Sequence, residues 1–514
     1  MWVLKGRLVP MSKDAGVGGD EEAVFAGRVW IGDDGRIVAV TRSTKAGPPE
    51  FRGALQVDVG SSLVMPGMID LHNHLAYNTL PLWTEPSQLV PFKHHDSWTR
   101  AATYSTATTW PAYAMITACP QELLAYVETK AVVGGTTTVQ GSPPQNRPRD
   151  GWLVRNVEDE SFGTGDRNMI YASTLTAKPP VLAERANRMR SGSSFIYHCS
   201  EGQKDSLVAR EWADAARAGC LQPSFVAVHA NAVDPAVFAS WASPGGIAWS
   251  PLSNLWLYGQ TTDVPAARAA GVTVSLGSDW APSGTKHVLG EVKVARLVSD
   301  HLDWGLTDVD LVRMVTCNPG DLLKLAWDRQ VGRLQPDAIA DLVVVQAKRG
   351  ASPFRTIVGA TEADIELVVI DGRPRYGVPP LMSAASADPV TTLEVGGEQR
   401  ELSLSHPDDP TVAWRWQDVV DRMEQVRADP KGEIQAAQGR LAAWAGRLDH
   451  PDAPLRLALD MPTGLAPVGG LPKDLTDVVV PPVQSLTHDS DWIGSLSGRG
   501  FHGGVLDGLA SYYA

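Results

Sequence analysis

Two histidines separated by one residue follow the first long apolar segment of the chain. His72 and His74 come at the end of Val64–Leu71, a run with β-strand character that leads through Asp70. Side chains alternate along an extended backbone, so residues two apart point the same way and both imidazoles face one side. Two imidazoles on one face can share a metal ion. Because the pattern His-x-His is short enough to arise by chance, its meaning depends on what ends the other strands.

Three later apolar runs also end in a residue that binds metals or titrates. His198, His229 and Asp279 each come directly after a short run with strand character. A lone histidine after a strand is usually a surface or core residue, but a repeat of this arrangement at three successive strands is hard to ascribe to chance. Imidazoles together with one carboxylate suit Zn²⁺, with Fe²⁺ as the nearest competitor. The sequence therefore predicts a divalent metal site built at the ends of strands.

The elements that would carry these residues alternate between strands and helices from Val64 onward. Expected helices include 121–133, 206–218 and 264–270, and expected strands are 64–71, 136–140, 152–157, 169–175, 195–197, 225–228, 246–250 and 272–276. Seven or eight βα units over about 270 residues fit a (β/α)₈ TIM-type barrel, an α/β fold whose active site lies at the carboxyl ends of the strands. A doubly wound open sheet is the alternative, but it would place a glycine-rich phosphate loop after the first strand, and Met65-Pro66-Gly67-Met68 is not one.

The segments on either side of the barrel have a different character. Residues 1–63 contain short β-branched runs, with a hairpin signal around Asp34-Gly35, and residues 334–377 return to strand character after the barrel, which spans 64–333. We expect both flanks to form one small β-sandwich domain. Residues 378–514 form an extension of unassigned role with a helical pair at 412–428 and 433–448, and we expect its deletion from about residue 385 to impair folding or assembly rather than to remove the metal.

Composition narrows the class of protein further. The chain has 514 residues and a net charge of −13, and it has 4 Cys in no metal-binding or disulfide pattern. An acidic chain of this size argues against a general binder of nucleic acids or anionic membranes, because phosphate affinity depends on clustered cations, but it does not rule out a local basic patch. The first residues are too short an apolar run for a signal sequence. We therefore expect a cytoplasmic protein with a small-molecule substrate, no nucleic acid, no membrane, and assembly as a homo-oligomer. The 17 Trp exceed the 9 Phe and 10 Tyr, an unusual bias.

Several motifs occur in an order that resembles one known family. Val64–His74 resembles the opening strand motif of the amidohydrolase superfamily, and Gly134–Val139 resembles its second strand. His198-Cys199-Ser200-Glu201 is similar to the HxxE motif of the subgroup that holds triazine hydrolases and cytosine and guanine deaminases. Further matches along about 24–377 are Ser250–Leu255, Leu276–Asp279, Thr316–Pro319 and Ala340–Val344.

The resemblance implies one divalent metal ion held by His72, His74, His198 and Asp279, with bound water as the nucleophile. No lysine stands where it could bridge two metals after the fourth strand, which favours a mononuclear site. Asp279 would take a proton from the water, and Glu201 would donate one to a ring nitrogen or leaving amine. His229 would stabilise the developing oxyanion. The alternative roles are a solvated carboxylate for Glu201 and a further ligand for His229.

These roles predict hydrolytic deamination of a nitrogen heterocycle. Alternatives are the opening of a cyclic amide in the same site and, in another class, a catalytically inactive scaffold. Candidate substrate contacts follow the strands that carry the site: Trp83, Trp98, Trp110, Asn254, Trp256, Trp280 and His287. The triplet His94-His95-Asp96 lies in the long segment after the first strand. A polar exposed loop is the favoured interpretation of this triplet, with a second metal motif as the alternative.

Overall fold

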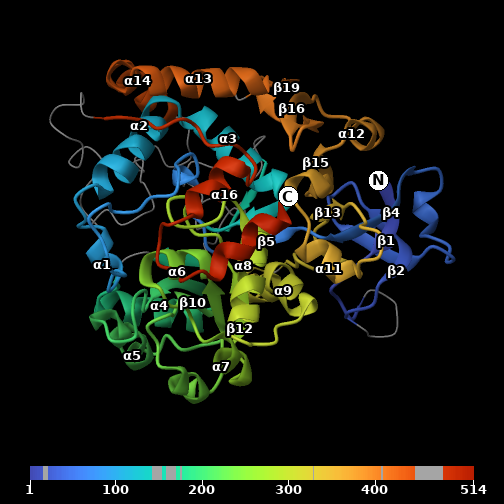
Figure 1. The fold of residues 1–514 in the computed structure, drawn as a ribbon. Helices are drawn as coiled ribbons and strands as arrows, with labels where there is room; N and C mark the ends of the chain where they lie inside the picture. Colours follow the sequence, from blue (N-terminus) through green and yellow to red (C-terminus); the bar gives the residue numbers. More distant parts are fainter. Residues whose placement is uncertain are drawn as a thin grey trace.

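The structure is a computed structural model, and it describes residues 1–14, 21–141, 153–157, 170–173, 176–327, 329–406, 409–445 and 478–513. Most of the chain forms a barrel of strands and helices, with a β-sheet at one side and helices of the C-terminal extension across one end (Figure 1). Within these residues no helix is both long enough and apolar enough to span a bilayer.

Eight parallel strands build the barrel, as predicted. They form a three-stranded and a five-stranded sheet. The two sheets meet where Leu71 N–H donates to Leu276 O at 3.4 Å and Asp279 N–H donates to His72 O at 2.9 Å. The strands are β5 (Met68–Asp70), β6 (Thr136–Val139), β7 (Arg155–Asn156), β8 (Ile170–Ser173), β9 (Ser194–Cys199), β10 (Phe225–His229), β11 (Gly246–Trp249) and β12 (Thr273–Leu276). The predicted strands at 152–157 and 169–175 reach beyond the described residues, at 152, 169, 174 and 175.

The predicted strand Val64–Leu71 is wrong as a single element, because it divides at Gly67. Before Gly67 the chain pairs with the flanking sheet, where Val64 faces Val344, and after it Met68 pairs with Thr136 of the barrel. A Cβ atom at Gly67 would lie 2.2–2.8 Å from the side chain of Thr137, so a residue without a side chain is needed where the two sheets meet.

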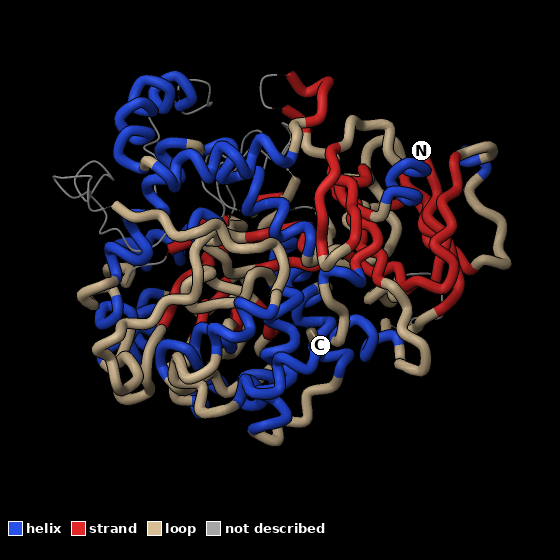
Figure 2. The backbone as a smooth tube through the Cα atoms, turned by 45° about the horizontal axis from the view of Figure 1, so that its top comes forward, coloured by secondary structure: helices blue, strands red, loops and turns tan. Residues whose placement is uncertain are grey.

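A nine-stranded sheet joins the two ends of the chain (red in Figure 2). Its strand β4 pairs with β1 on one side and with β13 on the other, which confirms the predicted association of the two flanks. In spatial order the strands are β16 (Thr391–Val395), β17 (Glu398–Leu402), β15 (Arg373–Gly377), β14 (Ile365–Ile370), β13 (Leu342–Val345), β4 (Leu55–Pro66), β1 (Trp2–Leu8), β2 (Phe25–Ile31) and β3 (Ile37–Arg42). β16 and β17 lie beyond residue 377, so the sheet takes in part of the segment that the sequence assigned to the extension.

Helices cover the barrel between its strands and continue into the loops at its ends. The α-helices up to the returning flank are α1 (His95–Trp98), α2 (Trp110–Ala118), α3 (Pro120–Val133), α4 (Pro179–Arg190), α5 (Arg210–Ala218), α6 (Pro251–Tyr258), α7 (Val264–Ala269), α8 (Val288–His301), α9 (Asp308–Val315), α10 (Cys317–Lys324), α11 (Pro353–Val358) and α12 (Pro379–Ala385). Short 3₁₀ or π turns add Pro49–Phe51, Leu75–Tyr77, Ser105–Thr109, Leu207–Ala209, Pro235–Ser240 and Glu362–Asp364.

The C-terminal extension packs on the barrel in two parts. The predicted helical pair is present as α13 (Trp416–Ala428) and α14 (Pro430–Ala445), preceded by the hairpin β18 (Ser405–His406) and β19 (Asp409–Ala413), and residues 446–448 lie outside the described chain. α13 packs on α3 and α14 on α2. The final segment holds α16 (Ser490–Leu496) and a 3₁₀ turn at Val505–Tyr512, and it returns to the loops above the barrel, where Phe501 N–H donates to Trp256 O at 3.2 Å (Figure 1).

Candidate active site

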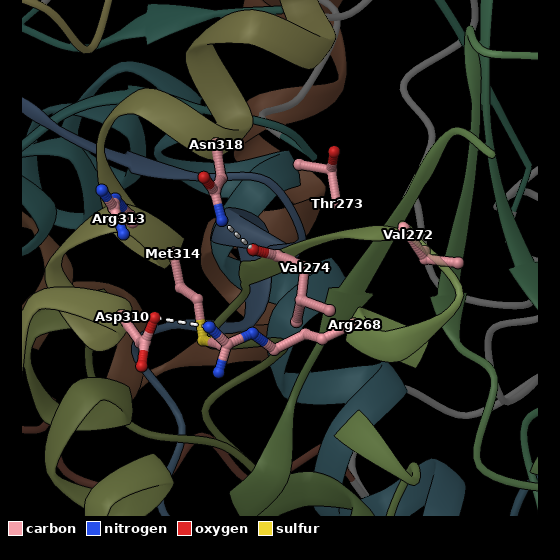
Figure 3. A pocket seen from close by; sticks show the side chains of 9 residues that line it. Arg268, Val272, Thr273, Val274, Asp310, Arg313, Met314 and Asn318 are labelled. Carbon is pink, nitrogen blue, oxygen red and sulfur yellow. Dashed lines mark hydrogen bonds and ion pairs between the residues drawn. The ribbon is translucent and has the colours of Figure 1, made fainter. Parts of the chain in front are cut away.

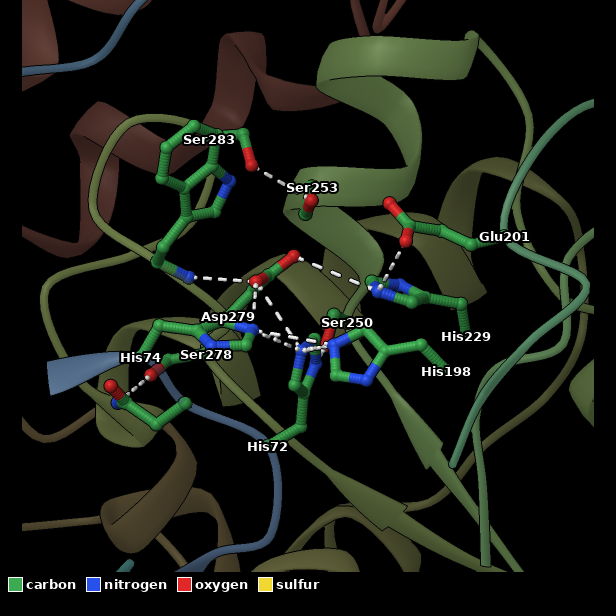
Figure 4. A network of polar contacts seen from close by, with 12 residues as sticks. His72, His74, His198, Glu201, His229, Ser250, Ser253, Ser278, Asp279 and Ser283 are labelled. Atoms are coloured by element: carbon green, nitrogen blue, oxygen red, sulfur yellow. Dashed lines mark hydrogen bonds and ion pairs between the residues drawn. The ribbon is translucent and has the colours of Figure 1, made fainter. Parts of the chain in front are cut away.

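The strand ends bring four imidazoles and two carboxylates into one buried cluster (Figure 4). β5 leads into the two histidines of the His-x-His motif, β9 and β10 supply one histidine each, Glu201 follows β9, and Asp279 follows β12. None of these six side chains is more than 5% exposed. The six residues are His72, His74, His198, Glu201, His229 and Asp279, and all were predicted from the sequence.

Three of the imidazoles point their Nε2 atoms at one another. The Nε2 atom of His72 lies 3.2 Å from that of His74 and 2.9 Å from that of His198, and the last two are 3.3 Å apart. Four ligands in a tetrahedron around zinc, each about 2.0–2.1 Å from the ion, are spaced by about 3.3 Å. The Nδ1 atom of His72 lies 2.7 Å from Ser250 Oγ, the kind of outer contact that orients a ligating imidazole. The spacing and donor set fit a divalent metal ion.

Asp279 closes this group on the side of β12. Its Oδ1 atom lies 3.3 Å from His72 Nε2 and 3.6 Å from His74 Nε2, and it accepts a hydrogen bond from Trp280 N–H at 2.9 Å. Asp279 adopts a φ of 60°, in the left-handed region. Such a conformation is costly for a residue with a side chain and persists where surrounding contacts impose it. Burial and the nearby Glu201 charge raise the pKa of Asp279 well above its usual value.

A further buried carboxylate below the cluster ties two strand ends together. Asp70 accepts hydrogen bonds from Ser278 N–H at 3.0 Å and from the Asn73 side-chain amide at 2.9 Å, and its Oδ2 atom accepts from Ser278 Oγ at 2.5 Å. Burial raises the pKa of Asp70 to about 6, although these hydrogen bonds act to lower it. Asp70 therefore connects the loop that carries the first two histidines to the loop that carries Asp279.

Glu201 is held by a tyrosine that the sequence analysis did not identify. The hydroxyl of Tyr258 donates to Glu201 Oε1 at 2.5 Å and accepts from Trp98 Nε1–H at 2.7 Å. The other carboxylate oxygen, Oε2, lies 3.7 Å from His229 Nε2. Burial acts to raise the pKa of Glu201, but the imidazoles of His229 and His95 outweigh it and hold that pKa below its usual value. Tyr258 stands four residues after Asn254 on α6, so helical spacing was the signal that could have identified it.

The triplet His94-His95-Asp96 is not the exposed loop that we favoured. His95 is only 3% exposed, and its Nδ1 atom lies 3.6 Å from Glu201 Oε2. Its backbone N–H also donates to Glu201 O at 3.3 Å. The second-metal alternative is also unsupported, since none of the candidate metal clusters among the described residues includes this triplet. His95 instead helps to enclose Glu201.

Aromatic side chains from the predicted substrate loops gather next to the cluster. The rings of Trp98 and Trp280 have centroids 5.4 Å apart; Tyr104 contacts both rings, and Tyr77 contacts Trp280. Trp256 Nε1–H donates to Trp83 O at 2.7 Å, which joins α6 to the same loop. Trp110, by contrast, opens α2, where it is half-buried against the apolar core.

Asn254, also a predicted substrate contact, instead touches His229. Its Nδ2 atom lies 3.0 Å from His229 Nδ1. The amide side chain is fully buried on α6. Asn254 thus belongs to the site, but with a role in holding an imidazole.

His287 lies in a separate buried group and not with the predicted substrate residues. Its Nε2 atom is 3.0 Å from Glu362 Oε1, which also accepts from His488 Nδ1 at 2.6 Å. These three residues have the donor types of a metal site. However, His488 Nε2 accepts from Lys286 N–H at 3.0 Å, so Nδ1 must carry the proton and cannot bind a cation. The buried ammonium groups of Lys286 and Lys293 add repulsion, and the group is better explained as a contact that fastens the C-terminal segment.

A cavity of about 260 Å³ lies at the other end of β12, away from the cluster (Figure 3). Thr273 and Val274, at the start of that strand, line it, whereas Asp279 follows the end of the strand. Its cation Arg268 is paired with Asp310 at 2.5 Å, and its cation Arg313 donates to acidic residues before β2. The cavity therefore offers no free charge for a ligand.

Comparisons with known proteins agree with this architecture. Residues 223–375 match the family model described as the amidohydrolase family. A 5-methylthioadenosine/S-adenosylhomocysteine deaminase of Symbiobacterium thermophilum is 25% identical over 72% of this chain and 92% of that protein. A 5′-deoxyadenosine deaminase of Methanothermobacter thermautotrophicus is 30% identical over 43% of this chain and 56% of that protein.

Solved structures show the same fold. A zinc-bound adenosine deaminase from Xanthomonas campestris superposes with a TM-score of 0.57 at 16% identity, over 85% of this chain and 98% of that one. A guanine deaminase from Bradyrhizobium japonicum gives 0.55 at 15% identity, over 73% and 98%. At these identities the likeness concerns the fold alone. The family model thus identifies an amidohydrolase family domain in residues 223–375, and these solved structures share the fold of the chain.

Proposed function

We propose that this protein is a metal-dependent hydrolase that deaminates a nitrogen heterocycle. The observation that carries the proposal is the convergence of the three Nε2 atoms of His72, His74 and His198 within 2.9–3.3 Å, beside the carboxylate of Asp279 and the pair Glu201–His229. The curated relatives described above are named as deaminases of adenosine-type compounds, which supports the same chemistry here.

The metal ligands that we propose are His72, His74, His198 and Asp279. Three imidazoles and one carboxylate favour Zn²⁺, with Fe²⁺ as the alternative, and the adenosine deaminase of similar fold was solved with zinc. Such an ion lowers the pKa of a bound water toward about 7, which supplies hydroxide at neutral pH. The fully buried surroundings strengthen this electrostatic effect, because few waters remain to screen it.

The remaining polar groups are placed to move the proton. The Oδ2 atom of Asp279 lies 3.9 Å from His229 Nε2, so it stands between the ligands and the catalytic pair and can accept a proton from the nucleophilic water. Glu201 can carry a different proton, taken up before the attack, on Oε2, because Oε1 already accepts from Tyr258. It then delivers the proton to the ring nitrogen or to the leaving amine. His229 Nε2 lies beside both carboxylates, where a hydrogen bond to the attacked centre would stabilise developing negative charge.

The proposed substrate surface is aromatic. Trp83, Trp98, Trp256 and Trp280 belong to the loops and the helix above the cluster, with Trp98 and Trp280 in mutual contact. Flat heterocycles stack on such rings. Trp110 and His287 are left out of this surface because they pack elsewhere.

Metal analysis and ammonia release test the proposal together. We expect about one zinc or iron per chain, lower metal affinity in Asp279→Asn, and ammonia release from adenosine-type and other aminated heterocycles. Glu201→Gln should keep the metal and lose at least about a hundredfold in kcat, since general acid–base groups contribute about 10²–10⁴. Hydrolysis of a cyclic amide without ammonia would favour the ring-opening alternative. A protein that neither contains nor takes up metal would favour the inactive scaffold.

A homo-oligomer and a cytoplasmic location stay predictions. The exposed Leu89 and Val90, 88% and 64% exposed, lie in the loop before α1 and would become less accessible if that loop contacts a second copy. Light scattering of the purified protein measures the oligomeric state directly.

A further inference from the structure

We infer that Trp249 and Thr261, acting through Asn254, fix His229 as the neutral tautomer that carries its proton on Nε2. This inference rests on the proposed function for its catalytic meaning, but the tautomer itself is a property of the protein without substrate. It makes His229 a hydrogen-bond donor and excludes it as a further metal ligand. Trp249 and Thr261 thereby become positioning residues for the reaction.

The hydrogen-bond chain starts at a group that can only donate. The indole Nε1–H of Trp249 donates to Thr261 Oγ1 at 2.7 Å, and the Thr261 hydroxyl donates to Asn254 Oδ1 at 3.3 Å. Indole has no acceptor atom, so the first bond has a fixed direction. With the Asn254 oxygen engaged by Thr261, its amide N–H faces His229 Nδ1 at 3.0 Å. Nδ1 must then be the acceptor, and in a neutral imidazole the proton resides on Nε2.

The other side of the ring favours the same tautomer. His229 Nε2 faces Glu201 Oε2 at 3.7 Å and Asp279 Oδ2 at 3.9 Å. An N–H group directed toward two carboxylate oxygens is favourable, whereas a lone pair there would meet other lone pairs. A ring whose Nδ1 atom accepts a hydrogen bond carries at most one proton, on Nε2, so this geometry corresponds to the neutral ring.

The backbone of His229 is also held in place by a neighbour of Thr261. His229 has a φ of 63°, a conformation that is costly for a residue with a side chain. Its carbonyl accepts a hydrogen bond from the hydroxyl of Thr262, and Ala230 N–H donates to Cys199 O at 3.1 Å. The segment after α6 therefore fixes both the ring and the main chain of this histidine.

The tautomer decides between two roles that the sequence left open. A ligating nitrogen must offer a lone pair to the metal, and Nε2 is the only ring nitrogen of His229 that faces the cluster. With a proton on Nε2, His229 instead donates to the oxygen on which negative charge develops. It does so without changing its own charge, and Glu201 remains the group that carries the proton.

Nitrogen NMR of protein labelled in its histidines tests the tautomer directly. We expect His229, assigned with a His229→Gln variant, to show a protonated Nε2 and an unprotonated Nδ1. Thr261→Val removes the hydroxyl at nearly constant shape, and we expect a mixture of tautomers together with a kcat about tenfold lower at similar KM, the effect of one net hydrogen bond. Thr261→Ser should restore both properties. Thr129→Val, which removes a buried hydroxyl on α3, should change neither.

The outcomes separate this inference from the proposed function. A proton on Nδ1 of His229 in the wild-type protein, or a tautomer unchanged in Thr261→Val, would overturn the inference whatever reaction the enzyme catalyses. An Nε2 proton in a protein that releases no ammonia from any heterocycle would support the inference and reject deamination.

Discussion

Replacing Tyr258 by Phe removes one hydroxyl and separates two roles for that residue. Its oxygen lies 2.5 Å from Glu201 Oε1 and 2.7 Å from Trp98 Nε1, and all three side chains are buried. The variant leaves Glu201 without one charge-assisted hydrogen bond, worth about 1.5–3 kcal/mol. If that bond orients the carboxylate in the transition state, kcat falls about 10- to 100-fold and KM changes little. The metal content should stay the same.

The measurement is steady-state kinetics of ammonia release, paired with thermal unfolding. The orphaned N–H of Trp98 costs about 1–3 kcal/mol of stability, so a lower Tm alone does not support the prediction. Tyr126→Phe is the matched control, because the Tyr126 hydroxyl is buried and donates to Gln484 O in the C-terminal segment. It should lower Tm without lowering kcat. An unchanged kcat in Tyr258→Phe with a similar loss of Tm would show that Tyr258 only supports the fold.

Two further predictions concern the C-terminal segment. His488 has a pKa lowered to about 3 by burial, so below pH 6.5 the unfolded chain binds a proton that the folded one does not, and stability is lost as the pH falls. Between pH 7 and 5 this lowers the stability by about 2 kcal/mol. We expect amide hydrogen exchange at residues 486–496, corrected for the pH dependence of the intrinsic exchange rate, to become about 30-fold faster. The variant His301→Gln, at an exposed histidine, should show the same acceleration, and an exchange rate that does not change with pH would contradict the role of His488.

Deleting residues 478–514 removes two hydrogen-bond donors from Glu362. We expect lower solubility and a lower Tm with the metal still bound, and a soluble truncation with the wild-type Tm would contradict this prediction.

The strand ends of the barrel were predictable because their chemistry is local. A β-branched run followed directly by His198 or His229 can be identified without any knowledge of distant contacts. The direction of parallel strands then forces such residues to one end of the barrel. That rule brings His198 to the same end of the barrel as His72 and His74, whose His-x-His spacing places them on one face. The three imidazoles meet there, with Nε2 atoms 2.9–3.3 Å apart.

Contacts set by loops were not predictable in the same way. His287 follows the eighth strand closely in sequence, yet a Cβ at Gly134, just before β6, would lie 2.3 Å from its Nδ1 atom, so the loop has carried it toward the opposite end of the barrel. His95 shows the opposite difference: we expected it in an exposed loop, and the structure places it in contact with Glu201. Tyr258 was missed because its partner Glu201 lies in the loop after β9, and helical spacing alone does not say what a residue faces.

The surplus of tryptophan has a physical connection to the site. Trp98 and Trp249 each begin a hydrogen-bond chain, one ending at Glu201 and the other at His229. An indole combines a large apolar surface with a group that only donates, so it excludes water and fixes the direction of the bonds that follow. A buried serine or glutamine could donate or accept, so it would not fix the direction of the hydrogen bonds. With an indole at the start of each chain, Oε2 of Glu201 remains available to carry a proton, and Nε2 of His229 remains available to donate a hydrogen bond. Two of the tryptophans in this surplus therefore act through the hydroxyl groups that accept from them, Tyr258 and Thr261.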